Sequence, residues 1–157
     1  MALELRRFTW MIGLVLLAQG TLPALAGLGG GVDSVQADGS HMKARVKAAV
    51  QGAGYTVQEL QLPSGTTVQE YVAPGGAVFG VSWSGPTMPD LRQIFGSYYE
   101  QYLEASSAAP HNGATRRHFA VSGADLVVQS SGRMRHYFGR AYVPSLFPSG
   151  VSTDVIQ

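Results

Sequence analysis

Hydrophobic and polar residues alternate along three short runs in the first half of the chain, and turn-forming residues separate these runs. The runs are Tyr55–Leu62, Thr66–Val72 and Ala77–Trp83, with Pro- and Gly-containing segments at 63–65 and 73–76. A period of two residues is typical of strands with one buried face. Because the separating turns are tight, the pattern predicts antiparallel strands that follow one another directly.

One face of the third run is apolar and aromatic, and we expect that face to meet the core. Its members are Ala77, Phe79, Val81 and Trp83. Gly80 lies within the same run. A glycine inside a strand indicates a bulge or a close approach of another backbone, so we expect one of these at Gly80.

The pattern changes to a helical period after Pro89 and Asp90. Apolar or aromatic residues then recur every three to four positions: Leu91, Ile94, Phe95, Tyr98, Tyr99, Tyr102 and Leu103. Proline is favoured at the first helical position and a carboxylate stabilises the first turn. We therefore predict a long amphipathic helix over 89–105. Its tyrosines, together with Trp83, could also line a ligand groove, but their spacing favours packing on a sheet.

Two further regions complete the predicted fold. Strands are expected at Phe119–Ser122, Ala124–Gln129 and Met134–Val143, with turns at 122–123 and 130–132. Near the N-terminus, Asp33 and Gln36 resemble a capping box, and apolar residues at 35, 42, 46 and 49 favour a short helix over about 41–50. The predicted fold class is α+β: an antiparallel sheet built from two three-strand groups, packed against one long amphipathic helix, with a short N-terminal helix.

The first 26 residues have the three-part pattern of a secretory signal peptide. Arg6 and Arg7 precede an apolar run over 11–18, and Ala24 and Ala26 supply small residues at a cleavage site. The run is shorter than the ~20 residues that a membrane-spanning helix needs. We therefore predict a signal peptide over 1–26, a flexible Gly-rich leader over 27–32 and a single α+β domain over 33–157, with no stable membrane anchor after cleavage.

Charge and cysteine content narrow the class of partner and the compartment. The chain has 11 Lys and Arg against 10 Asp and Glu, and cleavage after Ala26 would remove Glu4, Arg6 and Arg7 and leave a formally neutral domain. A neutral domain lacks long-range attraction for phosphate backbones, so we expect no nucleic acid partner. Because the chain has no Cys, it can form no disulfide and accept no lipid at the cut. We expect a periplasmic or secreted bacterial protein.

Four stretches of the chain resemble a known family. They are Leu62–Val72, Val78–Pro86, Pro89–Gln93 and Gly139–Pro144. On these stretches the chain resembles the domain-of-unknown-function 2844 (DUF2844) family of exported bacterial proteins, in order over residues 30–157. The resemblance implies a bacterial envelope or secreted protein, and it supplies no catalytic or ligand-binding residue.

Arginine and aromatic residues interleave in the last predicted strand, which makes it the main candidate for a binding surface. The candidate residues are Arg133, Arg135, His136, Tyr137 and Arg140. On one strand, Arg133, Arg135 and Tyr137 would share a face, and His136, Phe138 and Arg140 would share the other. Such faces bind anionic polymers or acidic proteins through bidentate arginine and ring stacking. The simpler interpretation is that the arginines keep an edge strand soluble.

The sequence contains no recognisable catalytic, metal-binding or cofactor-binding motif. The four histidines are scattered, and neither a phosphate-binding loop nor a nucleophile elbow occurs. We therefore expect no cofactor and no metal. The function that the sequence favours is a non-catalytic binding or assembly protein that contacts an envelope protein or an anionic polymer.

Two other functions remain open from the sequence. One is a small envelope hydrolase or lyase in which His118 or His136 is the base and Asp125 or Asp90 orients it. The other is an assembly protein that docks by adding a strand at an open sheet edge, with the Gly-rich leader as an extended arm.

Overall fold

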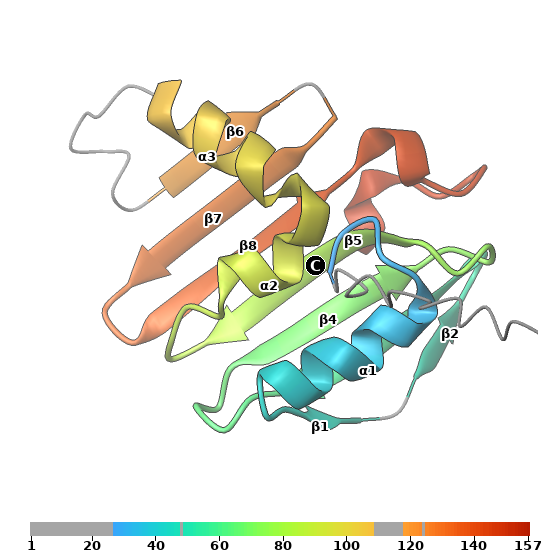
Figure 1. The fold of residues 1–157 in the computed structure, drawn as a ribbon, viewed down its shortest axis with the longest axis horizontal. Helices are drawn as coiled ribbons and strands as arrows, with labels where there is room; N and C mark the ends of the chain where they lie inside the picture. The colour runs from blue at the N-terminus through green and yellow to red at the C-terminus, as the bar shows by residue number, and fades with distance from the viewer. Residues whose placement is uncertain (1–26, 48, 109–117, 124) are drawn as a thin grey trace, which may run out of the picture.

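The protein folds as one antiparallel sheet with helices on one face. The computed structural model describes residues 27–47, 49–108, 118–123 and 125–157. Eight strands form the sheet in the order β1-β3-β4-β5-β8-β7-β6, and β2 pairs with β3 beside β1. The helices α1, α2 and α3 lie across one face of this sheet (Figure 1). The α+β class and the antiparallel sheet are confirmed, while the predicted signal peptide lies outside the described residues.

The strand order explains how the two predicted groups combine. The strands are β1 (Arg45–Val46), β2 (Val50–Gly52), β3 (Tyr55–Gln61), β4 (Thr67–Val72), β5 (Val78–Gly85), β6 (His118–Ser122), β7 (Val127–Arg133) and β8 (His136–Tyr142). The helices are α1 (Val32–His41), α2 (Leu91–Phe95) and α3 (Tyr99–Ala108), with 3-10 turns η1 (Gly96–Tyr98), η2 (Pro144–Leu146) and η3 (Thr153–Val155). β3–β4–β5 and β6–β7–β8 are consecutive hairpins, and pairing of β5 with β8 joins them.

The main core lies between the helices and the sheet. Val81 and Trp83 of β5 and Ile94 and Phe95 of α2 are buried there, and the Trp83 and Phe95 rings lie 6.0 Å apart. The tyrosines of α3 pack against this core as their spacing predicted, since the Phe95 and Tyr102 rings are 5.1 Å apart. Burial of these aromatic side chains is the main apolar contribution that holds the helices on the sheet.

The short N-terminal helix was predicted at the wrong place. The helix α1 spans Val32–His41, whereas the region predicted as helical, about 41–50, contains β1 and the first residue of β2. Lys43 has a φ of +50°, which ends the helical conformation and turns the chain toward β1. Gly39 is a poor helix former but lies inside α1. A Cβ at this position would come within 3.1 Å of Val46 Cγ2. The glycine therefore serves close packing of the helix on β1.

The predicted flexible leader is also wrong. Leu28 is buried in the main core, and its N–H donates to the Ile94 carbonyl at 3.0 Å. The N–H of Gly29 donates to the carbonyl of Val78 at 2.9 Å, and the Val78 N–H donates back to the Gly30 carbonyl at 2.9 Å. Residues 27–31 therefore pack against both α2 and β5. One buried apolar side chain and three hydrogen bonds offset the conformational freedom of the glycines.

The long predicted helix is confirmed in position but is broken into α2, η1 and α3. Asp90 caps α2 by accepting hydrogen bonds from the Arg92 and Gln93 N–H groups. The break follows α2 at Gly96, which has a φ of +51° and ends α2. A glycine adopts this conformation without a steric cost, so the helix changes direction there.

Gly80 marks both a bulge and a close approach, as the sequence indicated. The register between β4 and β5 shifts at Tyr71 and Val72, which leaves Phe79 as the extra residue. Phe79 therefore lies on the face away from the helices, in a second cluster with Tyr71 and Ile156. This corrects the prediction that Phe79 shares a face with Val81 and Trp83. A Cβ on Gly80 would come within 2.4 Å of Ile156 Cδ1, so the Ile156 side chain occupies the space that a side chain at position 80 would take.

The turn predicted at 130–132 does not occur, and β7 continues through it to Arg133. Gly132 pairs with Tyr137 across the hairpin, and a Cβ on Gly132 would come within 2.8 Å of the Tyr137 ring. The ring covers the glycine and keeps it in the strand. The turn instead forms at Met134 and Arg135, and Arg135 adopts a φ of +58°.

Candidate functional site

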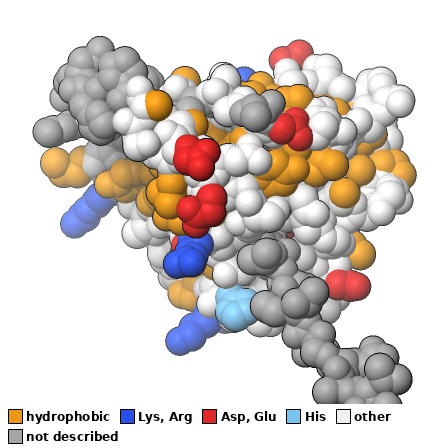
Figure 2. Space-filling view, turned by 45° about the horizontal axis from the view of Figure 1, so that its top comes forward, with side chains coloured by type: hydrophobic (Ala, Val, Ile, Leu, Met, Phe, Trp, Pro, Cys, Tyr) orange, Lys and Arg blue, Asp and Glu red, His pale blue; other side chains and the backbone are white. Residues whose placement is uncertain are grey.

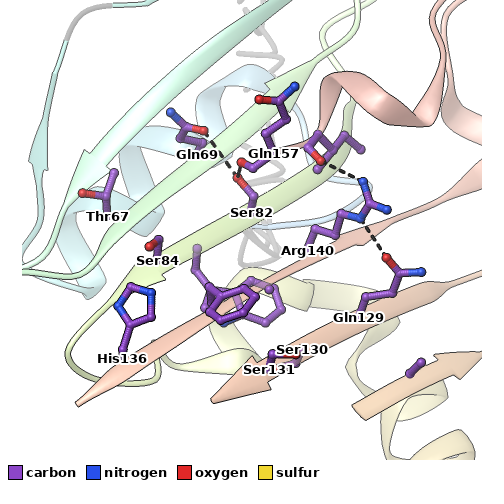
Figure 3. A pocket seen from close by; sticks show the side chains of 15 residues that line it. Thr67, Gln69, Ser82, Ser84, Gln129, Ser130, Ser131, His136, Arg140 and Gln157 are labelled. Atoms are coloured by element: carbon purple, nitrogen blue, oxygen red, sulfur yellow. Dashed lines mark hydrogen bonds between the residues drawn. The ribbon is translucent and has the colours of Figure 1, made fainter. Parts of the chain in front are cut away.

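The face of the sheet opposite the helices carries an open groove. The C-terminal segment covers one half of this face through the cluster of Tyr71, Phe79 and Ile156. The other half is hollowed into a groove of about 790 Å³ (Figure 3). Its lining residues are Thr67, Gln69, Ser82, Trp83, Ser84, Ala120, Gln129, Ser130, Ser131, His136, Phe138, Gly139, Arg140, Ile156 and Gln157. They come from β4, β5, β8, β7 and β6 and from the C-terminal segment.

Strand register arranges most of the lining side chains in two rows across the sheet. The amide row contains Gln69, Ser82, Arg140, Gln129 and Ala120, which are successive partners on neighbouring strands. The hydroxyl row contains Thr67, Ser84, Phe138 and Ser131 in the same way. Partners that face one another in antiparallel strands point to the same side of the sheet. The two rows are therefore fixed by the backbone pairing.

Phe138 is the exposed aromatic ring of the hydroxyl row. Its side chain is 43% exposed, because its cross-strand partners Ser84 and Ser131 are too short to cover it. The His136 ring lies two residues away on the same face of β8, with its centroid 5.6 Å from that of Phe138. The groove thus combines a flat apolar surface with hydroxyl and imidazole groups around it.

The C-terminal segment closes one end of the groove through hydrogen bonds. Ser82 Oγ donates to the Gln157 carbonyl at 2.6 Å. Arg140 Nη1 donates to the Ile156 carbonyl at 3.1 Å, and Arg140 Nε donates to Gln129 Oε1 at 2.8 Å (Figure 3). These contacts hold the guanidinium of Arg140 in one orientation. They use two of its five N–H groups, which leaves donors for a bound anion.

The structure divides the five predicted site residues between two places. His136 and Arg140 line the groove. Arg133 and Tyr137 border a second hollow of about 400 Å³ beside Leu91 of α2, and Arg135 lies in the hairpin turn. Arg133 is the cross-strand partner of His136 at the end of the hairpin, and it borders the second hollow together with Tyr137. The hairpin therefore does not present one basic surface.

The aspartates proposed for a His/Asp pair have other partners in the structure. Asp90 caps α2. Asp125 accepts hydrogen bonds from the N–H and the hydroxyl group of Ser145. His136 lies against Phe138 instead, and the side chain of His118 lies outside the described residues. Among the described residues, no cluster of three His, Asp or Glu side chains is arranged to hold a metal ion.

The sequence reasoning missed a pair of carboxyl groups buried under α1. Asp38 of α1 and Glu70 of β4 are both 0% exposed. Gln93 Nε2 and the Gly27 N–H donate to the Asp38 carboxylate. Burial, followed by the negative charge of Asp38, raises the pKa of Glu70 to about 9. Burial also raises the pKa of Asp38. The pair therefore retains one proton at neutral pH, on Glu70.

No sequence motif indicates that Asp38 and Glu70 form a pair, since they are far apart in the chain. The only available signal was Glu70 itself, a charged residue on the face of the run Thr66–Val72 that also carries Val68 and Val72. A carboxyl group on an apolar strand face requires a partner, which the fold supplies from α1.

The fold and the groove define an α+β protein with one antiparallel sheet, helices on one face and a polar groove on the other. The chain belongs to a family described as a protein of unknown function (DUF2844), whose sequence model matches residues 24–156. This match confirms the resemblance. No curated protein and no solved structure matches the chain. Among the described helices, none is long and apolar enough to cross a membrane.

Proposed function

We propose that the protein is exported and is a non-catalytic binding domain that holds an anionic polymer of the bacterial envelope in its groove. The observation that carries this proposal is the groove of about 790 Å³ on the face that the helices leave open. The labelled polar side chains of both rows point into the same space (Figure 3). Phe138 also lines this space. A concave site with a few convergent polar groups is the usual form of a ligand site.

The charge of the lining favours an anionic ligand over an acidic protein that would need a broad basic surface. Arg140 is permanently charged, and the lining residues that the structure describes include no Asp or Glu. On the face drawn in Figure 2, which is turned by 45° from the helix side seen in Figure 1, the basic side chains are scattered and form no broad basic surface. Arg133 and Arg135 lie at the end of the hairpin, and neither is among the residues that line the groove. A single oriented cation suits a polymer that carries anionic groups at intervals.

The shape of the groove favours a chain-like ligand. The lining spans five neighbouring strands from β4 to β6, which corresponds to about 19 Å at the usual strand spacing. A small metabolite would fill only part of this length. The hydrolase or lyase alternative has less support, because Asp90 and Asp125 are already engaged.

Ligand capture by a groove-filling variant tests this function. Ser84→Trp would place a large ring in the groove, where Ser84 is exposed, and Ser107→Trp on α3 is the matched control. We expect the wild type and Ser107→Trp to retain polymer from an envelope fraction and Ser84→Trp to lose it. Circular dichroism would establish that both variants fold. Equal capture by Ser84→Trp would overturn the proposal.

Export is tested by the mass of the protein recovered from the periplasm or the medium. We expect a chain that begins at Gly27, because the signal pattern ends at Ala26. Recovery of the uncleaved chain in the cytoplasm would contradict export while leaving the groove proposal in place.

A further inference from the structure

We infer, resting on the proposed function, that the polymer is an acidic polysaccharide, with a sugar ring stacked on Phe138 and a carboxylate bound by Arg140. This inference names the ligand class from three features of the groove. They are the exposed ring with its hydroxyl neighbours, the oriented guanidinium, and the complete pairing of the strands beneath them.

The surroundings of Phe138 match the surface of a sugar. A pyranose ring has an apolar C–H face and a rim of hydroxyl groups. Phe138 offers a flat apolar surface that is 43% exposed, and Ser84 and Thr67 continue the same row on β5 and β4. Hydroxyl side chains both donate and accept hydrogen bonds, as sugar hydroxyls do. A ring stacked on Phe138 would place its rim beside these groups.

Arg140 lies at the distance expected for a charged group on the sugar chain. It is two residues from Phe138 on the same face of β8, which corresponds to about 7 Å along the strand. Gln129 and the Ile156 carbonyl fix its guanidinium, and the fork of remaining N–H groups matches a carboxylate. Gln69 supplies an amide from the same row. The cation therefore recognises an anionic group beside the stacked ring.

The strands beneath the groove make a polypeptide a poorer ligand. An extended peptide gains affinity by pairing with a free strand edge. Here β4, β5, β8 and β7 are each paired on both sides, and β6 at the rim of the groove is the edge strand. The part of the groove around Phe138 and Arg140 therefore offers side chains alone. The span of about 19 Å accommodates about four sugar units, each roughly 5 Å long.

Binding of four matched probes to the purified full-length protein tests the inference by calorimetry. The probes are an oligogalacturonate of four or more units, the same oligosaccharide with its carboxylates reduced to alcohols, inorganic polyphosphate, and poly-L-glutamate. We expect the oligogalacturonate to bind at least about tenfold more tightly than each of the others, because only it offers both sugar rings and carboxylates. Equal or tighter binding of polyphosphate or poly-L-glutamate would overturn the inference.

Two pairs of variants separate the ring from the charge. Phe138→Ala should weaken oligogalacturonate binding about tenfold, whereas Met134→Ala, which alters an apolar residue that is 93% exposed outside the groove, should leave it within about twofold. Arg140→Lys keeps the positive charge but loses the paired N–H donors of the guanidinium. It should therefore reduce the ratio of the affinities for the carboxylated and the reduced oligosaccharide. Arg135→Lys, which lies outside the groove, should leave this ratio unchanged. Unchanged binding by Phe138→Ala would overturn the stacking.

The outcomes also distinguish this inference from the proposed function. If Ser84→Trp abolishes capture of envelope polymer but no glycan probe binds the wild type, the groove is the site and the polysaccharide assignment is wrong. If Ser84→Trp captures polymer like the wild type, the groove is not the site, and both proposals fail.

Discussion

At the scale of single residues, the buried pair of Asp38 and Glu70 is the feature with the clearest physical consequence. Both side chains are fully buried, and two carboxylates in one apolar site do not both ionise. Glu70 keeps its proton in the folded protein up to a pH of about 9 because its pKa is raised to that value. Its usual value in an unfolded chain is 4.5. The difference links the stability of the fold to pH.

Glu70→Gln should stabilise the protein at neutral pH. As pH rises above 4.5 the unfolded wild type loses the Glu70 proton while the folded state retains it, so wild-type stability falls until the pH reaches the folded pKa of about 9. Glutamine stays neutral in both states and has nearly the same size and shape as protonated glutamate. We expect the variant to gain about 3 kcal/mol in the free energy of unfolding at pH 7 and almost nothing at pH 4.

Urea unfolding of wild type and variant across this pH range measures the effect. Glu59→Gln is the control, because Glu59 pairs with Lys47 at the surface, with side chains that are 30% and 51% exposed. That substitution should leave the pH dependence nearly unchanged. A gain for Glu70→Gln of the same size at pH 4 and pH 7 would contradict the shared proton.

Gly139 of β8 gives a second prediction at this scale. A Cβ there would come within 2.4 Å of Trp83 Cζ2 and 2.7 Å of the Gln129 carbonyl. Gly139→Ala should therefore cost roughly 2 kcal/mol or more, because a backbone atom has little room to shift. Gly75→Ala, which meets nothing within 4 Å, should change stability by less than about 0.5 kcal/mol. Thermal unfolding of both variants measures the difference. Equal melting temperatures would show that β8 and its neighbours shift to accommodate the added methyl group.

At the scale of elements, the segment 27–31 behaves as part of the core. Leu28→Ala should destabilise the protein by about 2–4 kcal/mol, since the buried side chain leaves a cavity beside Ile94. Val32→Ala is the matched control, because Val32 is 47% exposed. Denaturant unfolding of both variants measures the cost. If Leu28→Ala had no more effect than Val32→Ala, residues 27–31 would be the loose arm that their glycine content suggests.

The elements that the sequence predicted well are those whose order depends on local signals. β3, β4 and β5 followed from alternation and tight turns, and α2 followed from Pro89 and Asp90. The errors arose where tertiary packing overrides local preference. Gly39 weakens a helix in isolation but permits contact between α1 and Val46, and Gly132 suggests a turn until the Tyr137 ring covers it. Neither partner is visible in the local sequence.

At the scale of the whole molecule, the groove depends on register, which no local pattern supplies. The sequence placed His136, Phe138 and Arg140 on one strand face, and the structure keeps them there. What it did not supply is the pairing of β5 with β8, which brings Ser82 and Ser84 beside Arg140 and Phe138. Arg133 and Arg135 were assigned to the same strand as these residues because the turn was predicted at 130–132, whereas it forms at 134–135.

The salt dependence of polymer binding distinguishes the groove from the basic strand that the sequence suggested. Among the described residues that line the groove, Arg140 is the one permanent cation. The logarithm of the affinity should therefore fall with the logarithm of salt concentration with a slope near one, since each cation releases about one counterion from a polyanion. A surface that also used Arg133 and Arg135 would give a slope near three. The measurement is titration of oligogalacturonate from about 50 to 500 mM NaCl, where the groove predicts a loss of roughly tenfold. Arg133→Ala and Arg135→Ala together should leave the slope unchanged. A slope near three that this double substitution reduces to one would move the site from the groove to the hairpin turn.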